Sequence, residues 1–94
     1  MPLIAISAPV RAAVLECEAN LDRRLPADEN ALAAAFGLGL EVAAEVVVLV
    51  ATWRYSRYLA RGGASLGVEE LAAHFQIGRD RALRVLQQAQ GNEA

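Results

Sequence analysis

The segment from residue 42 to residue 53 is apolar on nearly every side of the helix that it is expected to form. Successive residues of a helix are about 100° apart, so an unbroken apolar run leaves no polar face. The run includes Val42, Val46, Val47, Val48, Leu49, Val50 and Trp53. A helix that is apolar all round has to be covered on every side. The segment therefore demands a fold in which other helices, or a second chain, pack around it.

The same segment does not have the composition of a membrane span. Because of Glu41 and Glu45, the longest uncharged runs are residues 31–40 and 46–53, whereas a span needs about 20 apolar residues. No basic stretch precedes the apolar start of the chain, so no signal peptide is expected. Cys17 is the only cysteine, which excludes an internal disulfide and favours a reducing compartment. We expect a cytoplasmic protein without a membrane partner.

The composition favours helices over strands. The 94 residues include 20 Ala, 13 Leu and 9 Val, whereas aromatic residues make up only 5%. Ala is the best helix former, and its small side chain lets helices pack closely. The length suits one domain. We expect an all-α fold, a small bundle of about five helices in a single domain over residues 1–94.

The first helix is expected between two prolines. Ser7 can cap free backbone N–H groups, and Pro9 lacks the N–H that would otherwise stay unpaired in the first turn. Pro26 closes the helix. Apolar residues recur between them at helical spacing, in the order Val10, Ala13, Val14, Cys17, Leu21 and Leu25.

Two further helices are predicted from the residues that typically begin and end a helix. Asp28 predicts the cap of a short helix over residues 29–36, and the next helix is expected over residues 40–61. Glycine can adopt the left-handed conformation in which many helices end. The stops are Gly37 and Gly39 after the shorter helix, and Gly62 and Gly63 after the longer one.

The apolar segment predicts a homodimer. Two short helices in the first half are too few to cover residues 42–53 completely, and the C-terminal part can cover one side. We expect residues 1–53 to form a helical core and dimerisation part. The expected dimer interface consists of Val42, Val46, Val47, Val50 and Trp53. The alternative is a monomer in which residues 1–6 fold back over the segment.

Residues 66–90 form a second recognisable unit. Leu71, Ala72 and Phe75 give one helix a buried side, and a short break follows at residues 76–78. A second helix begins near Arg79, and its inward positions are Ala82, Val85, Leu86 and Ala89. This arrangement resembles the helix-turn-helix of bacterial transcription regulators. The resemblance covers residues 55–90; it implies a helix-turn-helix part over residues 54–90, a recognition helix after the break, and DNA as the partner.

Three positions depart from the pattern of that family. Gln76 stands where the turn usually has Gly, and Gly78 where Ser or Thr often caps the recognition helix. Leu83 lies on the face that normally offers a polar group to bases. Only four residues, 91–94, follow Gln90, so no β-hairpin wing is expected.

The modest net charge of −2 conceals two oppositely charged halves. Residues 1–53 hold three Arg and seven acids, whereas residues 54–90 hold six Arg and three acids. A basic C-terminal half has the right sign for contact with phosphates. Arg79 and Arg84 are placed to reach the major groove, where arginine pairs with guanine. The full set of expected DNA-binding residues is Arg79, Arg81, Leu83, Arg84, Gln87, Arg54, Arg57 and Arg61.

The residues that could carry chemistry do not form a recognisable catalytic or metal site. His74 is the only histidine, and Glu70 is the nearest carboxylate to it in the sequence. Because Glu70 is four residues before His74, we interpret the pair as neighbours on one face of a helix. Cys17 lies among the apolar positions of the first helix, so we expect it to be a small buried residue. Glu41 and Glu45 are expected to leave the core and meet Arg23, Arg24 or an arginine of a second copy. We expect a non-enzyme without a metal ion or cofactor.

Two functions remain open at this point. The first is a small bacterial, plasmid or phage transcription regulator that binds double-stranded DNA as a homodimer. The alternative is a protein-interaction module, such as an antiactivator or a phage-type inhibitor, on a degenerate helix-turn-helix fold. Leu83 on the outward face and the acidic first half favour the alternative, in which another regulatory protein is the partner.

Overall fold

The computed structural model describes residues 8–26 and 28–91, and these residues form five helices joined by short turns. Within these ranges no strand is present, so the expected all-α fold with about five helices is confirmed. Residues 92–94 lie outside the described part, as do residues 1–7 with the expected cap Ser7. The helices are α1 (Ala8–Asp22), α2 (Glu29–Phe36), α3 (Leu40–Ala60), α4 (Val68–Phe75) and α5 (Arg79–Gly91).

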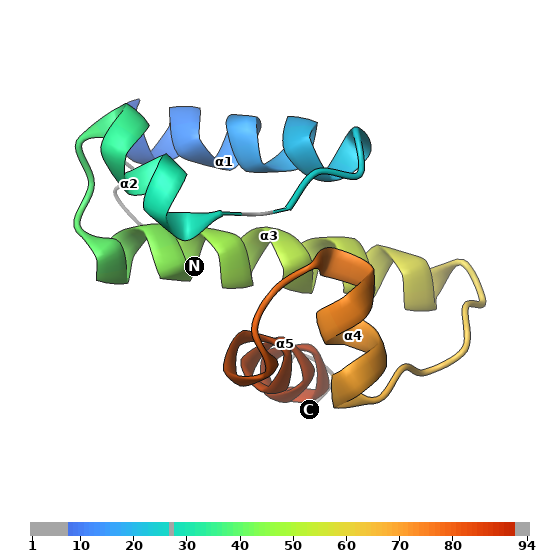
Figure 1. Cartoon of the computed structure of the whole chain (residues 1–94). Helices are drawn as coiled ribbons and strands as arrows, with labels where there is room; N and C mark the ends of the chain where they lie inside the picture. Colours follow the sequence, from blue (N-terminus) through green and yellow to red (C-terminus); the bar gives the residue numbers. More distant parts are fainter. Residues whose placement is uncertain (1–7, 27, 92–94) are drawn as a thin grey trace.

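Helix α3 is the central rod of the fold, and the other helices cover it from two sides (Figure 1). Helices α1 and α2 lie along one side, and α4 and α5 lie on another. On the first side, the buried cluster is Ala13, Cys17, Leu32, Ala43, Val46, Val47 and Val50. On the second side, it is Val48, Ala51, Tyr55, Leu71, Phe75, Ala82, Val85 and Ala89. Apolar side chains of α3 therefore contribute to two separate buried clusters.

The expected dimer interface is largely used within one chain. Val46, Val47 and Val50 are buried against α1 and α2 of the same chain, so their apolar character needs no second copy. Val42 and Trp53 are 42% and 41% exposed, and they lie on the part of α3 that the other helices leave open. The expectation of a homodimer stays a prediction, and it now rests on these two residues. The alternative covering segment, residues 1–6, lies outside the described residues.

Asp28, Gly37 and Gly62 act as expected at the ends of α2 and α3, whereas Gly39, expected to end α2, is the N-cap of α3. The Asp28 carboxylate accepts hydrogen bonds from the backbone N–H groups of Asn30 at 2.9 Å and Ala31 at 3.3 Å. Gly37 ends α2 in the left-handed conformation, with φ at +66°. Helix α3 ends at Ala60, one residue earlier than expected, and Gly62 turns the chain away with φ at +91°.

The first helix ends earlier than its apolar stripe predicts. Helix α1 stops at Asp22, and Arg24 adopts the left-handed conformation with φ at +61°. That turn takes Leu25 off the buried face, so Leu25 is exposed, contrary to the expectation. Ala13 and Cys17 are the fully buried residues of α1, and their small side chains let the helix lie close to α3.

No single helix in the described part of the chain is long and apolar enough to cross a membrane. Helices α2 and α3 reach the necessary length and composition only when they are taken together, and the chain bends by 120° between them.

Candidate functional site

Helices α4 and α5 form the unit in which DNA contact was expected. The hydroxyl of Tyr55 on α3 accepts a hydrogen bond from the Leu66 N–H at 2.9 Å, which fixes the loop that leads into α4. The turn between the two helices holds Gln76 in the left-handed conformation, with φ at +55°. Glycine adopts this conformation more readily than other residues. The Gln76 amide also donates to the backbone carbonyl of Arg24 at 3.0 Å and so ties the turn to the end of α1.

Two arginines of α5 are bound to carboxylates of distant helices. Arg81 donates through Nε and Nη2 to the two carboxylate oxygens of Glu29 on α2, at 3.0 and 2.9 Å. Arg84 donates through Nη2 to both oxygens of Glu45 on α3, at 2.9 and 2.7 Å. The hydrogen bonds to Glu29 raise the pKa of Arg81 above its ordinary value. These pairs hold α5 against α2 and α3, and the expectation that Glu45 meets Arg23 or Arg24 is wrong.

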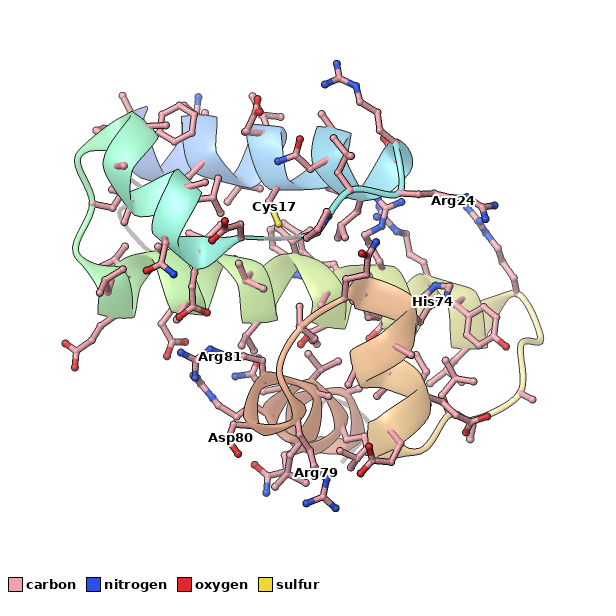
Figure 2. All side chains as sticks on the ribbon, viewed as in Figure 1. Cys17, Arg24, His74, Arg79, Asp80 and Arg81 are labelled. Atoms are coloured by element: carbon pink, nitrogen blue, oxygen red, sulfur yellow. The ribbon has the colours of Figure 1, made fainter. Side chains whose placement is uncertain are left out.

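The outward face of α5 begins with the exposed side chains of Arg79 and Asp80 (Figure 2). Arg79 lies on that face, and its Nε is 2.6 Å from the Glu69 carboxylate of α4. Asp80 and Gln87 are exposed beside it, and Leu83 is 45% exposed. The face that was expected to read bases therefore combines one neutralised arginine, one acid, one amide and one leucine.

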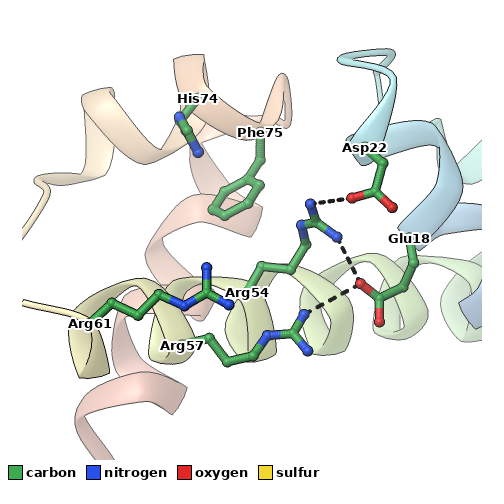
Figure 3. A pocket seen from close by; sticks show the side chains of 7 residues that line it. All are labelled: Glu18, Asp22, Arg54, Arg57, Arg61, His74 and Phe75. Carbon is green, nitrogen blue, oxygen red and sulfur yellow. Dashed lines mark hydrogen bonds and ion pairs between the residues drawn. The ribbon is translucent and has the colours of Figure 1, made fainter. Parts of the chain in front are cut away.

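A groove between α1, α3 and α4 brings together the other expected DNA-binding residues (Figure 3). Its lining is Glu18, Asp22, Arg54, Arg57, Arg61, His74 and Phe75, and its volume is about 550 Å³. Arg54 and Arg57 lie near the end of α3, and Arg61 directly follows the last residue of that helix. The sequence places the three arginines on one side of the helix, and the structure shows that this side faces α1 and α4.

Arg54 is fixed at the centre of this groove by two carboxylates of α1. Its Nη1 is 2.8 Å from Glu18 and its Nη2 is 2.7 Å from Asp22. Burial alone would lower the pKa of the Arg54 guanidinium, but the hydrogen bonds to Asp22 and Glu18 outweigh burial and raise it. Arg57 has only a longer contact, with its Nη2 at 3.5 Å from Glu18.

The sequence did not reveal that Glu18, Asp22 and His74 belong to this groove. Glu18 and Asp22 are four residues apart, so they lie on one face of α1, and that spacing was the available signal. His74 was expected to be a bystander on the surface of α4. Its ring instead lies in the groove wall, edge-on to the ring of Phe75 with 4.8 Å between the centroids.

The described residues include no group of three or more His, Cys, Asp or Glu side chains that could hold a metal ion. Cys17 is buried between α1 and α3, where desolvation raises the pKa of its thiol to about 11. A thiol in that state is a poor nucleophile.

Comparison with protein-family models, with curated proteins and with solved structures finds no match to this chain.

Proposed function

We propose that this chain is a protein-interaction module on a fold that resembles the helix-turn-helix, and that its partner is another regulatory protein or an enzyme. The observation that carries this proposal is the state of the three arginines on α5. Arg79, Arg81 and Arg84 are all ion-paired with carboxylates of the same chain.

Those ion pairs work against the use of α5 as a recognition helix. Binding to DNA draws its affinity from cations that are free to replace the counterions of phosphates. Each arginine of α5 would have to leave its carboxylate, and that carboxylate would then lie beside the phosphates. The carboxylates on or against α5 outnumber its three arginines, since they belong to Glu29, Glu45, Glu69 and Asp80. The surface around α5 is therefore slightly acidic.

The exposed face of α5 suits a protein surface better. Leu83 lies at the middle of this face, with Gln87 one turn further along. The centres of protein interfaces are depleted in charged residues and need apolar side chains that can be buried. We expect Leu83 to be buried by the partner, with the paired charges forming a polar rim.

A DNA-binding transcription regulator is the second candidate, because of how α3, α4 and α5 pack. Helix α5 packs against both α3 and α4 through one shared core, as the third helix of a helix-turn-helix domain does. In that case, Arg79 and Arg84 would exchange their carboxylates for bases or phosphates.

A comparison of three baits in lysates of the source cells tests the role of Leu83. The baits are the unaltered chain, Leu83→Glu, and a matched control, Leu15→Glu, which changes an α1 leucine that is 65% exposed. We expect one protein to be enriched at least tenfold by the unaltered chain and by the control, and to be lost with Leu83→Glu. Far-UV circular dichroism establishes that both variants stay folded. A partner that is retained by Leu83→Glu would show that this face of α5 does not bind it.

A further inference from the structure

The groove of Figure 3 continues towards the end of α1. A second cavity, also of about 550 Å³, shares Asp22, Arg54, His74 and Phe75 with the first one. It adds the side chain of Arg24 to the lining. The two cavities share these residues and form one open groove that is bordered by α1, α3 and α4, and each lies within the size range of small-molecule sites.

The groove has a surplus of positive charge that the chain itself does not neutralise. Four arginines line it, and only two carboxylates, those of Glu18 and Asp22, face them. Arg54 occupies both carboxylates at 2.8 and 2.7 Å. Two positive charges therefore remain in the groove, in contrast to α5, where every arginine has a carboxylate of its own.

Arg57 and Arg61 are the groove cations that are most available to a ligand. The Arg57 side chain is 57% exposed, and its single contact with Glu18 is long, at 3.5 Å. Arg61 is exposed and makes no ion pair within residues 8–26 and 28–91. The Arg54 ion pairs keep Glu18 and Asp22 occupied, which reduces the repulsion of an incoming anion.

We propose that this groove binds a phosphate monoester dianion, held by Arg57 and Arg61. Two charges of the ligand would match the two surplus charges of the groove. The guanidinium fork donates two parallel hydrogen bonds to phosphate oxygens, which makes arginine well suited to this anion. The edge of His74 and the ring of Phe75 form the wall against which the organic part of the ligand would pack. Leu83 is not among the residues that line the groove, so this site does not depend on the proposed function.

Titration with inorganic phosphate, followed by NMR at constant ionic strength, tests the site. We expect shifts at Arg57, Arg61 and His74 that saturate with a Kd on the order of 1 mM, as weak binding of a small anion would give. The double variant Arg57→Gln/Arg61→Gln should weaken binding at least tenfold. The matched control Arg11→Gln/Arg23→Gln removes the same charge from exposed positions outside the groove and should change the Kd less than twofold.

Two further probes identify the source of the phosphate. Tighter binding of a phosphoserine peptide than of its unphosphorylated form supports the site and assigns the ligand to a protein. Tighter binding of adenosine monophosphate supports the site and assigns the ligand to a small molecule. The proposal is overturned if the double variant and the control bind phosphate equally well. It is also overturned if a short DNA duplex, with a steep salt dependence, is the only anion that shifts these residues.

Discussion

The Leu71→Ala variant is expected to lose about 3 kcal/mol of unfolding free energy, as fully buried leucines commonly do. Leu71 is the largest fully buried side chain among residues 8–26 and 28–91. It packs in the cluster that joins α4 and α5 to Val48, Ala51 and Tyr55 of α3. Truncation to Ala removes its apolar contacts and leaves a cavity, because neighbours in a packed core relax only in part. Small domains have only about 5–15 kcal/mol to lose.

Urea unfolding followed by far-UV circular dichroism measures this loss. We expect one transition at lower urea, because α3 belongs to both cores and cannot stay folded when one of them is lost. Leu83→Ala is the matched control, since it truncates an exposed leucine of α5 and should change the free energy by less than about 0.5 kcal/mol. Two separate transitions in Leu71→Ala would contradict the account of α3 as a rod shared by both cores.

The Cys17 thiol is expected to resist alkylation in the folded protein by at least 100-fold relative to the unfolded chain. Burial raises its pKa from 9.0 to about 11, and the thiolate is the reactive form. At pH 8 the thiolate fraction of Cys17 is therefore about 100-fold smaller in the folded protein than in the unfolded chain. Steric protection by the neighbouring side chains slows the reaction further. Alkylation with iodoacetamide, followed by mass spectrometry with and without guanidinium chloride, measures the two rates.

The same pKa predicts how stability responds to alkaline pH. The unfolded thiol ionises near pH 9.0 and the folded one near pH 11, so burial of the neutral thiol contributes its full stability below pH 9. That contribution is lost as the pH rises from 9 to 11, because only the unfolded state gains charge there. A Cys17→Ala variant lacks this group and should show a flatter pH profile. Rapid alkylation of the folded protein at pH 8 would contradict the burial of Cys17 between α1 and α3.

The boundaries of α2 and α3 could be predicted from the sequence to within one residue because local residues determine them. Asp28 caps α2 through its own side chain, and Gly37 and Gly62 supply the left-handed turns after α2 and α3. These effects act within a few residues of the chain. Leu25 has the spacing of the buried residues of α1, but the left-handed turn at Arg24 precedes it, and Leu25 is exposed. A periodic pattern does not show where the helix that carries it ends.

The covering of α3 could not be predicted, because it depends on how closely helices approach. Val46, Val47 and Val50 suggested that a second copy was needed. The small side chains of Ala13 and Cys17 let α1 come close enough to bury them within one chain. Separation along the sequence does not indicate which helices will meet.

The ion pairs of α5 could not be predicted either, because their partners are far apart in the sequence. Glu29 and Arg81 are 52 residues apart, and Glu45 and Arg84 are 39 apart. The division into an acidic and a basic half suggested a free basic surface. The folded chain brings the two halves together, and carboxylates of α2, α3 and α4 neutralise the arginines of α5.

Fluorescence anisotropy with labelled duplex DNA at physiological salt tests the central claim, that the arginines of α5 are engaged within the chain. The duplexes are the promoter fragment of the protein's own gene and a scrambled sequence of equal length. We expect both to bind no more tightly than the ~10⁻⁴–10⁻⁶ M of non-specific contact. A promoter Kd below ~10⁻⁸ M that is lost in Arg79→Ala/Arg84→Ala, with helicity intact, would contradict the claim and establish α5 as a recognition helix.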